Sequence, residues 1–194
     1  ATGTERGLHA LVDIPVRRAR VEVQGRMGAT ALTGPRGLDQ RLQLRVDGAH
    51  GEMDRTVLDR MVAPLEHLLR NAVAHGIETP KERRKSGKDE TGTVVINVAH
   101  EGTEVVLSIR DDGRGMDVKL IRAKALERGL IAKDAQLDEN QIFSLITHTG
   151  FTTADSVTRL AGRGIGMDVV SNEIKNLSGN LNIQSTPGKG VEFI

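Results

Sequence analysis

The sequence predicts an α/β fold, a two-layer sandwich in which helices cover one face of a mixed, mostly antiparallel sheet. Strand-like segments occur in pairs joined by tight turns, and segments with the apolar spacing of helices lie between the pairs. Of the 194 residues, 38% are hydrophobic and 27% are charged, which is typical of a globular chain. We therefore expect one domain of ordinary size with a short segment before it.

The segment before the domain, residues 1–40, contains arginines but no lysine, since the first lysine of the chain is Lys81. The glycine-rich stretch 25–37 indicates a loop, and a short strand is expected at residues 21–23. We interpret residues 1–40 as a linker or the remnant of a preceding segment, with a basic binding patch as the alternative. The domain itself then covers residues 41–194.

The first elements of the domain are a strand and a long helix. Apolar residues alternate over residues 41–46 and predict the strand. Over Met53–Val73 they recur with helical spacing, so we expect a helix with Asp54 as its cap and a kink at Pro64. Gly76 is expected to end this helix, because glycine is common just after the last turn.

A polar loop is expected over residues 79–91, which are rich in lysine, arginine and glutamate. Strands follow at 94–99 and 105–110, and Glu101 and Gly102 join them in a hairpin.

Three further helices are expected at 118–128, 140–147 and 165–177. Residues 148–163 lack periodicity and are rich in glycine, threonine and serine, so we expect a mobile loop there. A last hairpin is expected within residues 181–194.

The composition excludes several classes of function. The net charge is +1 and the aromatic residues are three phenylalanines, so we expect no nucleic-acid binding. Cysteine is absent, which excludes disulfides and thiolate metal sites. No run of eighteen apolar residues occurs, so we expect no membrane insertion.

His67, Asn71 and His75 recur every four residues on the long predicted helix, so they would project from one side of it. An asparagine carbonyl oxygen can bind a hard cation such as Mg²⁺, and a histidine can accept a proton or donate to a phosphate. The hydrophilic edge of an amphipathic helix would give the same pattern. A zinc site is a further alternative, but it lacks a third nearby ligand.

A second segment, Asp-Asp-Gly-Arg-Gly at 111–115, directly follows a predicted strand. It places the Asp111 carboxylate at the strand end, and Gly113 and Gly115 then allow a ligand to approach the backbone closely. A buried carboxylate at this place could accept a hydrogen bond from an exocyclic amine. An ordinary Asp-Gly turn is the alternative.

A third segment, the glycine-rich stretch 162–167, leads into the last predicted helix. Glycines before a helix expose backbone N–H groups, and the helix dipole adds positive potential, so this segment could bind phosphate. It lacks the Gly-Lys-Ser/Thr of a Walker loop, and no strand precedes it as a dinucleotide fingerprint requires.

The three segments, in this order, resemble the ATPase superfamily of gyrase, histidine kinases and MutL. Residues 67–78 resemble the N box of the CheA-type histidine kinases, 111–115 their G1 box, 150–154 their F box and 162–170 their G2 box. The resemblance covers roughly Gln40 to Ile194. It implies the α/β ATP-binding fold of that superfamily, the Bergerat fold.

The resemblance also implies a role for each candidate residue. The catalytic residues would be His67, as general base or orienting group near the γ-phosphate, and Asn71, which would hold Mg²⁺ on the phosphates. Asp111 would bind the adenine amino group, and residues 148–163 would form the ATP lid. The residues implied in ATP binding are Asn71, His75, Asp111, Gly113, Gly115, Lys124, Gly162, Gly164, Ile165, Gly166 and Met167.

The sequence departs from the CheA pattern at four positions. Ala74 replaces an aspartate of the N box, Thr149 and Thr152 replace a proline and a serine of the F box, and Ala161 replaces a serine before the G2 box. These variants resemble the CheA-like hybrid kinases of type IV pilus systems.

The function implied by the resemblance is that of a cytoplasmic protein-histidine kinase in two-component, chemotaxis-like signalling. It would bind ATP with Mg²⁺ and transfer the γ-phosphoryl group to a histidine on a separate phosphotransfer domain. The full-length kinase would also work with a response regulator and with a coupling protein in a receptor array. We expect the isolated domain to be a monomer and the full-length kinase a dimer.

Two other functions remain open for this sequence. One is an ATP-driven conformational switch or hydrolase of the MutL or gyrase kind. The other is a module that binds nucleotide without turnover, because activity is more easily lost than binding.

Overall fold

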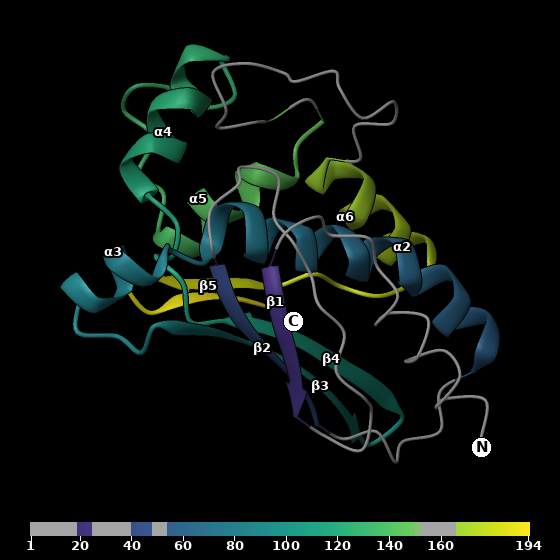
Figure 1. The fold of residues 1–194 in the computed structure, drawn as a ribbon. Coiled ribbons are helices and arrows are strands. Elements are labelled where there is room, and N and C mark those ends of the chain that lie inside the picture. The colour runs from purple at the N-terminus through teal and green to yellow at the C-terminus, as the bar shows by residue number, and fades with distance from the viewer. Residues whose placement is uncertain (1–18, 25–39, 48–53, 150, 152–165) are drawn as a thin grey trace. The chain divides into compact units, whose positions relative to one another are not determined.

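The computed structural model describes residues 19–24, 40–47, 54–149, 151 and 166–194 (Figure 1). The loop expected at 25–37 and nearly all of the lid expected at 148–163 lie outside these residues, so both stay predictions.

The chain divides into two compact units. The first comprises the chain up to Met116 together with Ser185–Ile194, and the second comprises Asp117–Gln184. The predicted site residues are therefore divided between the two units.

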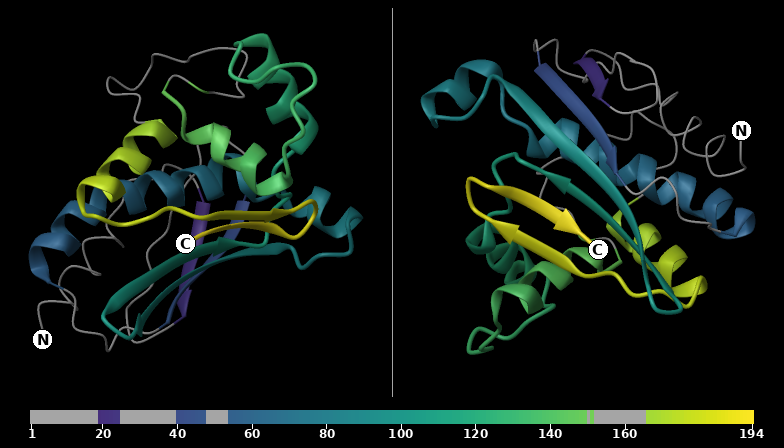
Figure 2. Two further views of the ribbon diagram at one scale, coloured as in Figure 1. Left: turned by 180° about the vertical axis from the view of Figure 1, so that it is seen from behind. Right: turned by 90° about the horizontal axis from the view of Figure 1, so that it is seen from below.

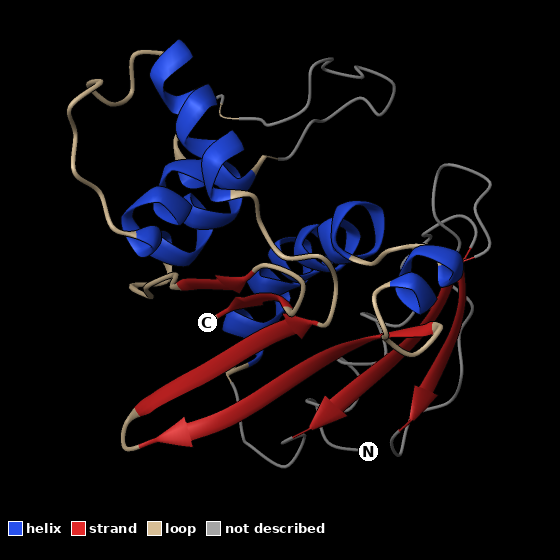
Figure 3. Cartoon of the chain, turned by 90° about the vertical axis from the view of Figure 1, so that its left-hand side faces the viewer, coloured by secondary structure: helices blue, strands red, loops and turns tan. Residues whose placement is uncertain are grey.

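The sheet has six strands in the order β1-β2-β3-β4-β6-β5, drawn in red in Figure 3. β1, β2 and β3 run parallel, whereas β4 pairs antiparallel with both β3 and β6. This confirms the predicted α/β class with a mixed sheet. The strands are β1 (Ala19–Gln24), β2 (Gln40–Asp47), β3 (Thr91–Glu101), β4 (Glu104–Asp111), β5 (Ile183–Thr186) and β6 (Gly190–Phe193).

The short strand expected at residues 21–23 is β1, which adds an edge strand to the sheet. Its backbone pairs with β2 so that Val21 lies opposite Leu42. Part of the segment 1–40 therefore belongs to the sheet of the first unit.

The buried face of the sheet follows from the two-residue period of its strands. Leu42 and Leu44 of β2 are buried, as are Val94 and Ile96 of β3. Ile109 of β4 is also buried and pairs with Ile96 across the antiparallel ladder. Helix α2 lies across one face of these strands (Figure 2).

The long predicted helix is α2 (Arg55–Asn71), which runs through Pro64 without interruption. Its N-terminus is capped as predicted, because the Asp54 carboxylate accepts the N–H of Thr56 at 2.7 Å. A π-turn, η1 (Ala72–Gly76), follows α2 directly, and Gly76 is its last residue.

The prediction of a polar loop over residues 79–91 is wrong in its first part, where Pro80–Lys85 forms helix α3. Thr79 and Glu82 form a capping box: the Glu82 carboxylate accepts the Thr79 N–H at 2.9 Å, and the Thr79 hydroxyl accepts the Glu82 N–H at 3.3 Å. The proline at the first helical position favours the same start. The sequence Thr-Pro-Lys-Glu carried this signal, but the helix is too short to show an apolar stripe.

The second unit contains the three helices predicted after the sheet. α4 and α5 pack on each other, and η2 contacts α6. A capping box between Asp138 and Gln141 starts α5. Among the described residues, no helix is both long enough and apolar enough to cross a membrane. The elements are α4 (Val118–Glu127), α5 (Glu139–Ser144), the 3-10 turn η2 (Leu145–Thr147) and α6 (Met167–Asn176).

Candidate functional site

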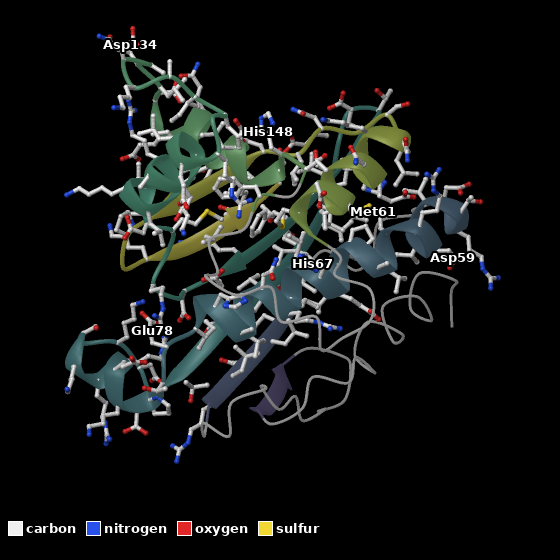
Figure 4. All side chains as sticks on the ribbon, turned by 90° about the horizontal axis from the view of Figure 1, so that it is seen from above. Asp59, Met61, His67, Glu78, Asp134 and His148 are labelled. Carbon is white, nitrogen blue, oxygen red and sulfur yellow. The ribbon has the colours of Figure 1, made fainter. Side chains whose placement is uncertain are left out.

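The C-terminal end of α2 carries the predicted histidine and asparagine. His67, which Figure 4 labels, and Asn71 lie one turn apart, and both are half-buried. After Asn71 the backbone enters η1, where the Ile77 N–H donates to the carbonyl of Ala72, five residues earlier, at 2.8 Å. The prediction of a single α-helical row therefore holds for His67 and Asn71. His75 lies beyond the α-helical residues, in the π-turn, and is exposed.

Asp111, at the end of β4, is the most deeply buried carboxylate described, with 4% of its surface exposed. Burial raises the pKa of its carboxyl to about 6, although N–H groups of Gly113 and Val191 bind the carboxylate and oppose this shift. The Gly113 N–H lies 2.9 Å from Oδ1. A buried carboxyl that still ionises near neutral pH is suited to accept a hydrogen bond from a ligand.

Three glycines, Gly76, Gly113 and Gly190, form a wall of backbone around Asp111, called here the three-glycine wall. A Cβ added to Gly190 would overlap the Asp111 carbonyl oxygen, and one added to Gly113 would overlap the Gly76 carbonyl oxygen. A Cβ on Gly76 would stand 3.2 Å from Oδ1 of Asp111. The end of η1, the segment 111–115 and the start of β6 can meet this closely only without side chains. The sequence predicted a site role for Gly113 but not for Gly76 or Gly190.

The segment 111–115 is also held against the turn between β5 and β6. Gly115 has a φ of +75°, and a Cβ there would stand 2.5 Å from the Thr186 carbonyl oxygen. The Arg114 carbonyl accepts the Gly188 N–H at 2.8 Å. Both the positive φ and the close approach require glycine at position 115, as the Asp-x-Gly-x-Gly pattern predicted.

A cluster of charged residues, Glu78, Arg83, Lys88 and Asp112, lies beside this segment, and Figure 4 marks Glu78. The Arg83 side chain is 1% exposed and binds Glu78 at 3.2 Å and Asp112 at 2.9 Å. We refer to these four residues as the charged cluster. This cluster was not predicted from the sequence, because a stretch rich in charged residues does not show which of their side chains the fold buries.

Lys88 completes the charged cluster. Its ammonium group donates to Glu78 at 2.8 Å and to the backbone carbonyls of Asp112 and Gly113 at 2.8 and 2.7 Å. Burial acts to raise the pKa of Glu78, but hydrogen bonds from Lys88 and from its own N–H, with the charges of Lys88 and Arg83, hold that pKa below its ordinary value. Glu78 is therefore ionised at neutral pH.

The second unit carries the other predicted site residues. Lys124 on α4 is half-buried and pairs with Glu127 at 3.4 Å. Gly166 precedes the first turn of α6, and Met167 is buried. The remaining three, Gly162, Gly164 and Ile165, lie outside the described residues.

The structure brings the end of η1 against the segment 111–115. Within the first unit, η1 follows directly on Asn71 and carries His75, and its last residue, Gly76, lies against Asp111 and Gly113. Within the described residues, no group of three or more histidines, aspartates or glutamates could hold a metal ion.

The chain is similar in sequence to several known proteins. The chain is 45% identical over 158 residues to "Chemotaxis protein CheA" of Bacillus subtilis (strain 168), a match that covers 80% of this chain and 24% of that protein. The CheA of Rhizobium meliloti (strain 1021) is 43% identical over 152 residues, covering 78% and 20% of the two chains. That of Halobacterium salinarum is 41% identical over 157 residues, covering 80% and 24%.

This chain thus spans less than a quarter of the length of these relatives. The family model described as "Histidine kinase-, DNA gyrase B-, and HSP90-like ATPase" matches residues 60–194, which include most of α2, and all of η1, the three-glycine wall and α6. The resemblance to CheA-type kinases is therefore confirmed, and the chain belongs to the family of histidine kinase-, DNA gyrase B- and HSP90-like ATPases.

Proposed function

We propose that this chain is the ATP-binding domain of a CheA-like histidine kinase. It binds Mg-ATP and transfers the γ-phosphoryl group to a histidine on a separate phosphotransfer domain. The observation that carries the proposal is Asp111, a buried carboxylate enclosed by the three-glycine wall.

Asp111 would select adenine through its exocyclic amino group. An ionised carboxylate accepts an N–H from adenine, whereas guanine presents a carbonyl oxygen at that position, which the carboxylate repels. Burial strengthens this preference for adenine over guanine. A buried carboxylate that faces the guanine carbonyl has no water to replace the missing hydrogen bond. The raised pKa of Asp111, about 6, leaves most of the carboxyl ionised at neutral pH.

Asn71 would hold the Mg²⁺ of Mg-ATP, since an amide oxygen is a suitable ligand for this hard cation. Mg²⁺ usually keeps several water molecules and phosphate oxygens as its other ligands, so one protein ligand is enough. When bound, Mg²⁺ neutralises charge on the phosphates during transfer. His67, one turn earlier on α2, would orient the γ-phosphate or act as the general base.

The glycine segment before α6 would complete the site. We propose that it binds the phosphates with backbone N–H groups, because the N-terminus of a helix attracts anions. The residues assigned to this part of the site are Lys124, Gly162, Gly164, Ile165, Gly166 and Met167. His75 would contact phosphate from η1.

The partners of the full-length protein belong to the proposal as well. The relatives are named chemotaxis proteins, and this chain spans less than a quarter of their length. We propose that the acceptor histidine, the response regulator and the coupling protein are bound through other parts of a longer kinase.

The test of the proposed function is phosphoryl transfer in trans. The purified chain is mixed with γ-labelled ATP, Mg²⁺ and a purified histidine phosphotransfer domain, and label on that domain is measured. We expect the domain to be labelled by the wild-type chain, with at least about a hundredfold less label from Asn71→Ala, because charge neutralisation dominates this transfer.

The same assay separates the alternatives. Steady release of inorganic phosphate without label on the acceptor would favour a switch or hydrolase of the MutL or gyrase kind. ATP binding without release or transfer would favour a non-catalytic nucleotide-binding module. Either result would contradict the proposed kinase function.

A further inference from the structure

We infer that Lys88 is a positioning residue for the nucleotide, because it fixes two peptide groups of the segment 111–115 and so holds Asp111 against the end of η1. This inference rests on the proposed function, in which Asp111 binds adenine. Lys88 itself touches neither Asp111 nor, in the proposed site, the nucleotide.

The contacts of Lys88 use its whole donor capacity. An ammonium group has three N–H donors, and Lys88 directs them to Glu78, to the Asp112 carbonyl and to the Gly113 carbonyl, all within 2.7 to 2.8 Å. The side chain is 18% exposed, so water competes little for these bonds. Glu78, which is 10% exposed, also holds the ammonium group by a charge-assisted bond.

The first peptide group that Lys88 holds joins Asp112 and Gly113. In a planar trans peptide the C=O and the N–H point in opposite directions. Lys88 binds the Asp112 carbonyl at one end, and the Gly113 N–H at the other end donates to Oδ1 of Asp111 at 2.9 Å. Fixing the carbonyl therefore fixes the N–H that orients the Asp111 carboxylate.

The second peptide group joins Gly113 and Arg114 and follows the same geometry. Lys88 binds the Gly113 carbonyl, and the Arg114 N–H on the opposite side donates to the Gly76 carbonyl at 3.0 Å. Gly76 is the last residue of η1, which begins directly after Asn71. One side chain thus holds both the acceptor for adenine and the junction with the helix that carries Asn71.

Arg83 supports the same peptide but does not replace Lys88. Its guanidinium donates to the Asp112 carbonyl at 3.3 Å, a longer bond, and its shorter bonds go to the Asp89 carbonyl at 2.6 Å and to the Asp112 carboxylate at 2.9 and 3.1 Å. Arg83 donates no hydrogen bond to the Gly113 carbonyl, so the second peptide group depends on Lys88.

The experiment compares wild type, Lys88→Met and the control Lys85→Met, whose side chain is exposed on α3. Amide hydrogen exchange is measured by NMR without nucleotide, and ATP and GTP affinities are measured by calorimetry. In Lys88→Met we expect exchange of the Gly113 and Arg114 amides to be at least about tenfold faster, with the Ile96 amide of β3 unchanged. We also expect ATP to bind about tenfold more weakly, with a lower ratio of ATP to GTP affinity.

The outcomes distinguish the inference from the proposed function. If the wild-type chain binds no ATP, the proposed function fails, and the exchange data alone decide whether Lys88 fixes the loop. If the wild type binds ATP and Lys88→Met binds it as well as Lys85→Met does, the inference is overturned and the proposed function stands.

If Lys88→Met does not fold, Lys88→Gln is used as the second variant. Loss of the fold in both would overturn the inference, since Lys88 would then hold the fold rather than the loop.

Discussion

At the scale of single residues, Asp111 shows how a binding site opposes stability. Its carboxylate is buried and its pKa lies near 6, so the folded chain keeps an ionised group where water is largely excluded. A protein without a ligand for this position would gain stability by replacing it. The residue is therefore better explained by binding than by folding.

We predict that Asp111→Asn stabilises the nucleotide-free chain at neutral pH. The folded-state pKa of about 6 exceeds the ordinary aspartate pKa of 3.8, so the free energy of unfolding falls as the pH rises between these values. The penalty is complete above pH 6 and corresponds to a free energy on the order of 3 kcal/mol. Asparagine keeps an oxygen to accept the Gly113 N–H, so Asp111→Asn should raise the free energy of unfolding by about 1–3 kcal/mol at pH 7.5.

Urea unfolding at pH 7.5 and pH 4 measures the difference in the free energy of unfolding between Asp111→Asn and the wild type. Asp59→Asn, on the exposed face of α2, is the control. The gain should shrink toward zero at pH 4, where the folded wild-type carboxyl is already protonated. A loss of stability in Asp111→Asn at both pH values would contradict this account of Asp111.

At the scale of elements, the sequence predicted the beginnings of helices better than their ends. Asp54 could be recognised as the cap of α2 because cap preference depends on the residue itself. The π-turn at Ala72–Gly76 could not be recognised, because its register depends on contacts of Gly76 with Asp111 and Gly113, which lie far away in sequence. The α-helical spacing assumed for His75 therefore ends at Asn71.

Helix α3 is an element that one buried cation anchors, and we predict that Arg83→Met destabilises the fold. The substitution leaves Asp112 without its guanidinium and removes one of the two cations that pair with Glu78. Breaking a buried pair by removing one partner typically costs about 3–5 kcal/mol. Urea or thermal unfolding of Arg83→Met, with the exposed neighbour Arg84→Met as control, provides the measurement. Equal stability of the two variants would refute the prediction.

At the scale of the whole chain, the family resemblance depended on the order of three polar segments, 67–75, 111–115 and 162–167, rather than on any one of them. The α/β class and most strands followed from apolar periodicity, as Val94, Ile96 and Ile109 show. The segment 111–115 could be placed at a strand end because β4 stops at Asp111. The charged cluster could not be predicted, because burial of Arg83 and Lys88 depends on how α3 and the loop after it pack.

The central claim is that ionised Asp111 binds the adenine of ATP, and its most direct test is the ratio of ATP to GTP affinity at two pH values. Both nucleotides carry the same triphosphate, so the ratio cancels the titration of the phosphates and isolates the base. Calorimetry should show ATP strongly preferred at pH 7.5, and the ratio should fall about tenfold at pH 5, where about a tenth of the carboxyl with a pKa of about 6 remains ionised. Equal affinities at pH 7.5, or a ratio that does not change with pH, would contradict the claim.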